Sequence, residues 1–181
     1  KDYISQLFNV IGTPEIKIIT GIRRSGKSKL LDIFAEQILK NEANANIIRI
    51  KLNVKKFEAL KDADKLYEYV DSNYIAGVNN YLFIDEVQLC KGFESSIISF
   101  HEEERYDIYL TGSNAFLLSS DLATLFGGRA FEINMFPFSF SEYRVYYPES
   151  DIDESFEDYV VNGGMSGSYL YKTSQDKKRY L

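Results

Sequence analysis

The stretch GIRRSGKS, Gly21 to Ser28, is a full match to the pattern G-x-x-x-x-G-K-[ST]. An apolar stretch typical of a strand, Ile16 to Thr20, precedes it, and a stretch typical of a helix follows it from Lys29. In this context a glycine-rich loop indicates a site for nucleotide phosphates, because the loop amides and the free N–H groups of the helix N-terminus can both point at an anion. The pattern therefore predicts a nucleoside triphosphate as the ligand of this loop.

The residues of this loop, called the P-loop below, have distinct expected roles. Lys27 is placed to reach the β- and γ-phosphates, and the Ser28 hydroxyl is placed to bind Mg²⁺. Arg23 and Arg24 occupy variable positions of the pattern, so we expect their side chains to lie outside the phosphate site and to contact another domain. The positions expected to form the nucleotide-binding segment, through backbone or side chain, are Gly21, Ile22, Arg23, Arg24, Ser25, Gly26, Lys27, Ser28 and Lys29.

Apolar stretches of strand length alternate with helix-like stretches along most of the chain. The expected strands cover residues 16–20, 46–52, 81–84, 107–110 and 131–135, and the expected helices cover residues 2–11, 27–42, 61–74, 92–105 and 114–126. Such alternation predicts a three-layer α/β fold with a five-stranded, mainly parallel sheet covered by helices on both faces. After Pro137 the pattern loosens, with helices expected near Glu142 and Glu154. We therefore expect a core domain over residues 1–136 and a C-terminal segment, either a truncated lid or the start of a following domain, over residues 137–181.

A second signal is an apolar stretch that ends in two carboxylates, Tyr81-Leu82-Phe83-Ile84-Asp85-Glu86. Ligands of parallel sheets bind at the carboxyl ends of the strands, so Asp85 and Glu86 are expected to face the phosphates held by the P-loop. Asp85 is suited to orient Mg²⁺ and its waters beside Ser28, and Glu86 is suited to polarise the attacking water. The alternative is that Asp85 only caps a loop. Behind a complete P-loop the metal-binding role is favoured, because phosphoryl transfer requires an acidic metal ligand on a neighbouring strand.

Two further segments place polar groups next to predicted strands. The fourth strand ends in Thr111-Gly112-Ser113-Asn114, where Ser113 or Asn114 can hydrogen-bond the γ-phosphate or the attacking water and so sense the nucleotide. The alternative is ordinary turn and helix-cap chemistry, which Ser and Asn both favour. Arg129 follows two glycines and is suited to stabilise transition-state charge in a neighbouring subunit. The favoured alternative is that Arg129 is an ordinary surface arginine or forms a salt bridge within its own chain.

Composition limits the class of protein. The 181 residues are 45% hydrophobic, which suffices for a globular core, and the net charge of −6 argues against nucleic-acid binding by this part of the protein. No apolar run approaches the roughly 20 residues of a membrane helix, so no membrane association is expected. The single cysteine, Cys90, excludes an internal disulfide, favours a reducing cytoplasm and is expected to be a buried, small apolar residue. His101, the only histidine, lies among glutamates and does not indicate a metal site.

Together these motifs resemble a known group, the AAA+-type predicted ATPases of bacteria and archaea. Four blocks in the same order carry the resemblance: GIRRSGKSKLL at 21–31, FIDEVQ at 83–88, TGSNAFLLS at 111–119 and FPFSFSEY at 136–143. It covers about residues 16–165.

This resemblance implies an ATPase core of the additional-strand type, in which the strand ending at Thr111 lies between the strands bearing Lys27 and Asp85. It supports a nucleotide sensor directly after that strand. It also places Arg129 near the arginine-finger position of oligomeric AAA+ proteins, which implies a homo-oligomer. In that family a longer C-terminal portion normally follows, similar to restriction-endonuclease-like folds in some readings, and we expect a protein or nucleic-acid client to bind through it. The family's second sensor arginine has no match in this chain.

The leading hypothesis is Mg²⁺-dependent binding and hydrolysis of ATP by a switch or motor core. The alternatives are a GTPase, a small-molecule kinase, and a nucleotide-gated binding module with negligible turnover. A GTPase needs an Asn-Lys-x-Asp element after a late strand, and Thr173-Ser174-Gln175-Asp176 lacks the lysine. A kinase needs an acceptor pocket, whereas Glu86 beside Asp85 suits water activation better. Adenine is expected to contact residues near Val10 to Gly12, just ahead of the first strand.

Overall fold

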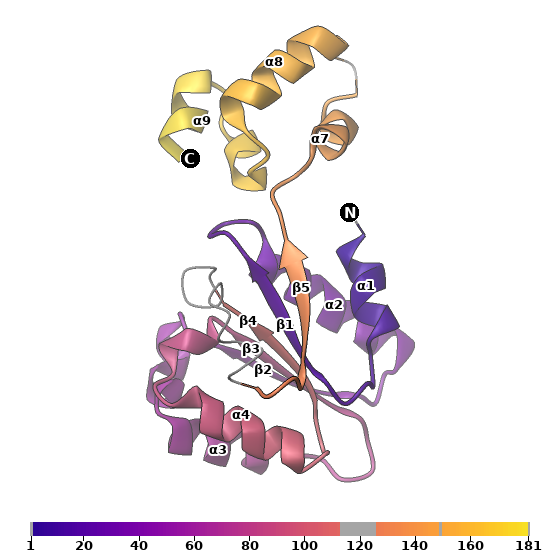
Figure 1. Ribbon diagram of the computed structural model, residues 1–181, viewed down its shortest axis with the longest axis vertical. Helices are drawn as coiled ribbons and strands as arrows, with labels where there is room; N and C mark the ends of the chain where they lie inside the picture. The colour runs from indigo at the N-terminus through magenta and orange to yellow at the C-terminus, as the bar shows by residue number, and fades with distance from the viewer. Residues whose placement is uncertain (1, 113–125, 149, 181) are drawn as a thin grey trace.

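The computed structural model describes residues 2–112, 126–148 and 150–180. Its centre is a sheet of five strands in the order β2-β3-β4-β1-β5, and every neighbouring pair is parallel (Figure 1). The strands are β1 (Ile16–Gly21), β2 (Asn46–Lys51), β3 (Asn80–Asp85), β4 (Asp107–Thr111) and β5 (Ala130–Met135). The predicted three-layer α/β fold is therefore confirmed, and the sheet is wholly rather than mainly parallel.

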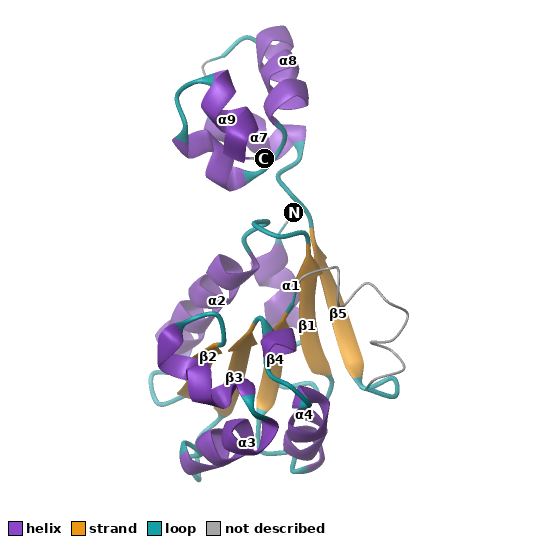
Figure 2. Ribbon diagram, turned by 90° about the vertical axis from the view of Figure 1, so that its left-hand side faces the viewer, coloured by secondary structure: helices purple, strands orange, loops and turns teal. Residues whose placement is uncertain are grey.

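Helices cover both faces of this sheet (Figures 1 and 2). The helices of one face are α1 (Tyr3–Asn9) and α2 (Lys27–Asn41), and those of the other are α3 (Ala63–Ser72) and α4 (Phe93–Glu102). Short helical turns, η1 (Lys55–Lys61) and η2 (Val87–Leu89), lead into α3 and α4. The predicted helix over 114–126 falls outside the described residues except for Phe126, which lies in a turn.

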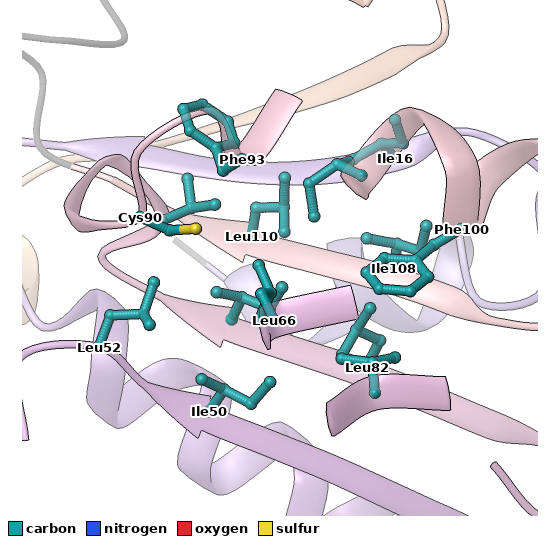
Figure 3. Packing of buried hydrophobic residues seen from close by; sticks show 14 of the residues in the cluster. Ile16, Ile50, Leu52, Leu66, Leu82, Cys90, Phe93, Phe100, Ile108 and Leu110 are labelled. Atoms are coloured by element: carbon teal, nitrogen blue, oxygen red, sulfur yellow. The ribbon is translucent and has the colours of Figure 1, made fainter. Parts of the chain in front are cut away.

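Alternate residues of each strand supply two apolar cores. In β1, Ile18 packs toward α3 and α4 whereas Ile19 packs toward α1 and α2, because successive side chains of a strand point to opposite faces. β1 and β3 are buried at all six positions, as parallel strands between two helical layers must be. Figure 3 shows the core on the side of α3 and α4, where Leu66, Phe93 and Phe100 meet the strands. Cys90 is buried in this core, and desolvation raises the pKa of its thiol to about 11, so the expectation of a small apolar residue is confirmed.

The position of β4 matters most for function. β4 lies between β1 and β3, which confirms the additional strand implied by the family resemblance. Because all five strands run the same way, the carboxyl ends of β1, β3 and β4 meet at one edge of the sheet. Gly21, Asp85 and Thr111, the last residues of these three strands, therefore lie at the same edge.

Beyond the carboxyl end of β5 the chain forms a group of helices, here called the helical unit (Figure 1). It consists of α7 (Phe140–Tyr146), α8 (Ile152–Asn162), η3 (Ser166–Leu170) and α9 (Ser174–Tyr180). The helix expected near Glu142 is α7. It begins with a capping box, in which the side chains of Ser139 and Glu142 each bond the backbone of the other residue. The ring of Tyr143 packs against the rings of both Tyr159 and Tyr169.

Within the part of the chain that the structure describes, no helix is both long enough and apolar enough to span a membrane.

Candidate nucleotide-binding site

The backbone of the P-loop turns sharply at three left-handed positions. Gly21, Arg24 and Gly26 have φ values of +147°, +68° and +104°. A Cβ on Gly21 would overlap the carbonyl oxygen of Met135 on β5, so only glycine fits there. α2 then begins at Lys27 without a side-chain cap, so the N–H groups of its first turn remain available to an anion.

Lys27 is the buried cation of this loop. Its side chain is only 5% exposed, and Nζ donates hydrogen bonds to the carbonyl oxygens of Gly21 at 2.8 Å and Ile22 at 3.0 Å. An ammonium group has three N–H donors, and the described residues accept two of them. One donor therefore remains for a ligand. Burial lowers the pKa of Lys27, while the charges of Glu86 and Asp85 act in the opposite direction. An anion bound here would relieve the cost of burying this charge.

Asp85 joins the P-loop to β4. Its Oδ1 accepts hydrogen bonds from the Ser28 hydroxyl at 2.9 Å and from the Thr111 hydroxyl at 2.5 Å. Thr111 Oγ1 in turn accepts the backbone N–H of Glu86 at 3.0 Å, which fixes the turn after β3. The expectation that Asp85 lies against the P-loop residue Ser28 agrees with this geometry.

The oxygens at this point suit a magnesium ion. Asp85 is 3% exposed, and its Oδ2 is buried and accepts no hydrogen bond from the residues described. A buried carboxylate oxygen without a partner is costly, and a cation beside the Ser28 hydroxyl would satisfy it. The described residues hold no group of three or more His, Cys, Asp or Glu arranged for a metal. Phosphate oxygens and waters would therefore complete the coordination of Mg²⁺, as is common for this ion.

Glu86 has an unusual backbone conformation. Its φ of +59° and ψ of +50° are left-handed, which is uncommon for a residue with a Cβ. The side chain is half-buried, and Oε2 accepts a hydrogen bond from the Gln88 amide. Strain of this kind persists where the surrounding structure holds it, often at functional sites. The turn thus fixes the position of the Glu86 carboxylate next to that of Asp85.

One predicted site residue, Arg129, does not join this group. Arg129 lies at the amino end of β5, on the opposite edge of the sheet, and its guanidinium is 3.1 Å from a carboxylate oxygen of Glu102. This ion pair matches the alternative favoured from the sequence, a salt bridge of Arg129 within its own chain. Ser113 and Asn114 lie outside the described residues.

The expected adenine contacts near Val10 to Gly12 are wrong. The N–H of Gly12 donates to Asp107 Oδ2 at 2.8 Å, and Asp107 begins β4. Residues 10–12 therefore lie at the amino ends of the strands, whereas the P-loop follows their carboxyl ends. β1 has six residues, and at about 3.3 Å per residue it separates the two edges by roughly 20 Å.

Two features of the site were not anticipated from sequence. Thr111 was considered only as the start of a sensing turn, yet it bonds Asp85 across 26 positions of the chain. A basic pair on β2, Arg49 and Lys51, also lies near the site and forms ion pairs with Asp32, one turn after Ser28 in α2. Lys51 stands opposite Asp85 in the register of β2 and β3. The only signal in the sequence was the alternation of basic and apolar residues at the end of that strand.

The comparisons with known proteins agree with this architecture. A family model described as an AAA domain matches residues 13–144. A protein of Haemophilus influenzae is 32% identical over 170 residues, which are 91% of this chain and 42% of that protein. A protein of Methanocaldococcus jannaschii is 28% identical over 182 residues, covering 92% of this chain and 37% of that protein. The chain thus spans about two fifths of the length of these relatives.

Solved structures show the same fold at low identity. AMPPCP-bound DnaA from Aquifex aeolicus matches 99% of this chain and 57% of its own, with a TM-score of 0.58 and 16% identity. Hsp104 of S. cerevisiae in complex with casein matches 99% of this chain and 35% of its own, with a TM-score of 0.59 and 14% identity. With the family match, the parallel sheet and the P-loop beside Asp85, the chain belongs to the AAA+ type of P-loop ATPase domains.

Proposed function

We propose that this chain binds ATP with Mg²⁺ and hydrolyses it, as the core of a molecular switch or motor. The observation that carries the proposal is the hydrogen bond from Ser28 to Asp85, which joins the P-loop to the carboxyl end of β3. The bound ATP analogue in the structural neighbour DnaA supports ATP as the nucleotide.

Each residue of the site has a defined part in this reaction. Lys27 and the N–H groups at the start of α2 bind the β- and γ-phosphate oxygens. Ser28 and Asp85 would hold Mg²⁺, which neutralises phosphate charge when bound. Glu86 accepts a proton from water as the water oxygen forms a bond to the γ-phosphorus, and the bond from that phosphorus to the β–γ bridging oxygen breaks to release ADP. Ser113 or Asn114 would sense the γ-phosphate.

One contact favours a second candidate, a nucleotide-gated binding module. Gln88 holds an oxygen of Glu86 in a hydrogen bond, which competes with the bond that a catalytic base makes to water. A chain that kept this contact with ATP bound would hold the nucleotide and turn it over negligibly.

Phosphate release and ATP binding, measured together, separate the two functions. We expect the wild-type chain to release phosphate and Glu86→Gln to bind ATP normally with turnover reduced at least about 100-fold, as for loss of a general base. Binding without turnover in both proteins would support the binding module instead. Repeating the assay with GTP in place of ATP tests which nucleobase the site prefers.

We also propose that Arg129 acts on the site of a neighbouring subunit. It is 46% exposed and cannot reach its own P-loop from the opposite edge of the sheet. Lys27→Ala and Arg129→Ala proteins should each be inactive, but their mixture should regain phosphate release. In a mixed assembly the intact P-loop of one chain meets the intact arginine of the other. A mixture as inactive as its components would contradict action between subunits.

The helical unit and the remainder of the longer relatives are proposed to carry the output of this site. Residues 137–181 would form a lid or the start of a following domain. A protein or nucleic-acid client would bind through the further C-terminal portion.

A further inference from the structure

One side chain of the P-loop leaves the phosphate site and contacts the helical unit. The guanidinium of Arg24 lies over the ring of Tyr180 at 4.7 Å from its centroid, and Nη1 donates a hydrogen bond to the Tyr180 carbonyl oxygen at 2.5 Å. These residues are 156 positions apart. Tyr180 is the last residue of α9, so the contact joins the nucleotide loop to the end of the helical unit.

Tyr180 is itself held firmly within that unit. Its ring packs on Tyr171 with centroids 5.5 Å apart. Its hydroxyl end lies so close to Gly167 that a Cβ there would overlap the ring and hydroxyl. The Tyr180 ring therefore links α9, to which it belongs, with η3 and the residue after it.

Arg24 also occupies a strained position in the loop. Its φ of +68° is left-handed, and a residue with a Cβ adopts this conformation at an energetic cost that glycine avoids. The neighbouring left-handed positions of the loop, Gly21 and Gly26, are both glycine. Such a conformation persists when outside contacts hold it, and the stacking and hydrogen bond to Tyr180 are contacts of that kind.

We propose that Arg24 is a positioning residue, which holds the P-loop in its phosphate-binding shape by its contact with Tyr180 and so couples nucleotide binding to the placement of α9. This inference rests on the proposed binding of ATP at the P-loop. Coupling between two sites is reciprocal. If the contact with Tyr180 strengthens nucleotide binding, bound nucleotide must stabilise the ordered position of α9 by the same free energy.

Two substitutions of Arg24 separate strain from contact. Arg24→Ala keeps the strained backbone and loses the contact, so Mg-ATP should bind about fivefold more weakly, the size of one lost cation–π interaction. Arg24→Gly loses both the contact and the strain, so its affinity should return toward that of the wild type. In both variants, Mg-ATP should no longer slow hydrogen exchange of the α9 amides, as it should in the wild type.

Variants on the other side of the contact complete the test. Tyr180→Phe keeps the ring and should behave as the wild type. Tyr180→Ala loses the ring but keeps the backbone carbonyl, so its affinity should fall in the same direction as that of Arg24→Ala and by no more. Arg179→Ala removes a 73% exposed arginine from the same helix and should change neither readout.

The outcomes distinguish this inference from the proposed function. Wild-type affinity and wild-type exchange of α9 in Arg24→Ala would overturn the role of Arg24 and leave ATP binding standing. A wild-type chain that bound no Mg-ATP would overturn both.

Discussion

At the scale of single residues, the site depends on how Asp85 uses its two oxygens. Oδ1 receives the hydroxyls of Ser28 and Thr111, while the buried Oδ2 accepts no bond from the described residues. The first oxygen therefore fixes the carboxylate, and the second is suited to orient a cation. Thr111, at the end of β4, therefore helps to fix the orientation of the Asp85 carboxylate.

Gly21 and Gly77 provide a matched pair for the P-loop backbone. Both have positive φ values, +147° and +80°, but a Cβ on Gly21 would overlap the Met135 carbonyl whereas a Cβ on Gly77 meets nothing within 4 Å. Gly77→Ala should cost about 1 kcal/mol of unfolding free energy from backbone strain alone. Gly21→Ala should cost about 3 kcal/mol or more and abolish nucleotide binding, because the backbone of β5 must also move. Urea denaturation compares them, and equal losses would show that the close approach to Met135 is unimportant.

Lys27 predicts a proton linked to nucleotide binding. Burial lowers the pKa of Lys27 below its ordinary value of 10.5, so in the alkaline range just below 10.5 the free folded chain holds fewer protons there than the unfolded chain. Stability from this group therefore rises with pH across that range. A bound triphosphate favours the charged ammonium, so nucleotide binding should take up protons in the same range.

Calorimetry in buffers of different ionisation enthalpy measures this uptake. The observed binding enthalpy should depend on the buffer in the alkaline range, and this dependence should weaken as the pH falls and Lys27 becomes protonated in the free chain as well. Equal enthalpies in all buffers throughout the alkaline range would contradict the proposed contact between Lys27 and phosphate.

At the scale of elements, the sequence predicted the strands better than their order or their partners. The strands at 16–20, 81–84 and 107–110 were predicted because apolar runs between polar turns leave few alternatives. The place of β4 between β1 and β3 came from the resemblance to a family, because pairing depends on contacts between distant residues. The bond from Thr111 to Asp85 was missed for the same reason.

The helical unit was the least predictable part of the chain. Helices near Glu142 and Glu154 were expected, but α9 was not, since its seven residues include little apolar periodicity. Its position depends on contacts made far along the chain, such as the ion pair of Lys177 with Asp158. The contact of Arg24 with another part of the protein was expected, but its partner Tyr180 was not.

Asp158 connects three helices of this unit and gives a prediction at this scale. Its carboxylate accepts bonds from Tyr143 at 2.6 Å, Asn162 at 2.7 Å and Lys177 at 3.2 Å. Asp158→Ala leaves these donors without their acceptor and should lower the unfolding free energy of the unit by about 1–3 kcal/mol. Glu157→Ala, an exposed neighbour in α8, should change it by less than about 0.5 kcal/mol.

Near-ultraviolet circular dichroism of the tyrosines follows this unfolding, and it also tests the pH dependence. Burial favours a higher pKa for Asp158, but the hydrogen bonds from Tyr143 and Lys177 outweigh it and hold the pKa below its usual value of 3.8. The stabilisation is therefore complete above 3.8 and is lost as the pH falls through the lowered pKa. An acid transition unchanged by Asp158→Ala would show that this carboxylate does not hold the unit together.

At the scale of the whole molecule, the chain combines a nucleotide domain with a helical unit that contacts its P-loop. The site lies at the carboxyl edge of the sheet, the same edge from which β5 leads into the helical unit (Figure 2). The P-loop and the helical unit therefore meet at this edge of the sheet, through the contact of Arg24 with Tyr180. The ion pair of Arg129 with Glu102 lies at the other edge, away from the P-loop of its own chain.

The most direct test of the central claim is a calorimetric titration of Mg-ATP into the wild-type chain, Lys27→Ala and Lys40→Ala. Lys27 is buried in the P-loop, whereas Lys40 is exposed in the last turn of the same helix. We expect saturable binding to the wild type and to Lys40→Ala. Binding to Lys27→Ala should be weaker by about 2–5 kcal/mol, or roughly 30-fold or more. Equal affinity of all three proteins, or no binding to the wild type, would contradict the assignment of this loop as the ATP site.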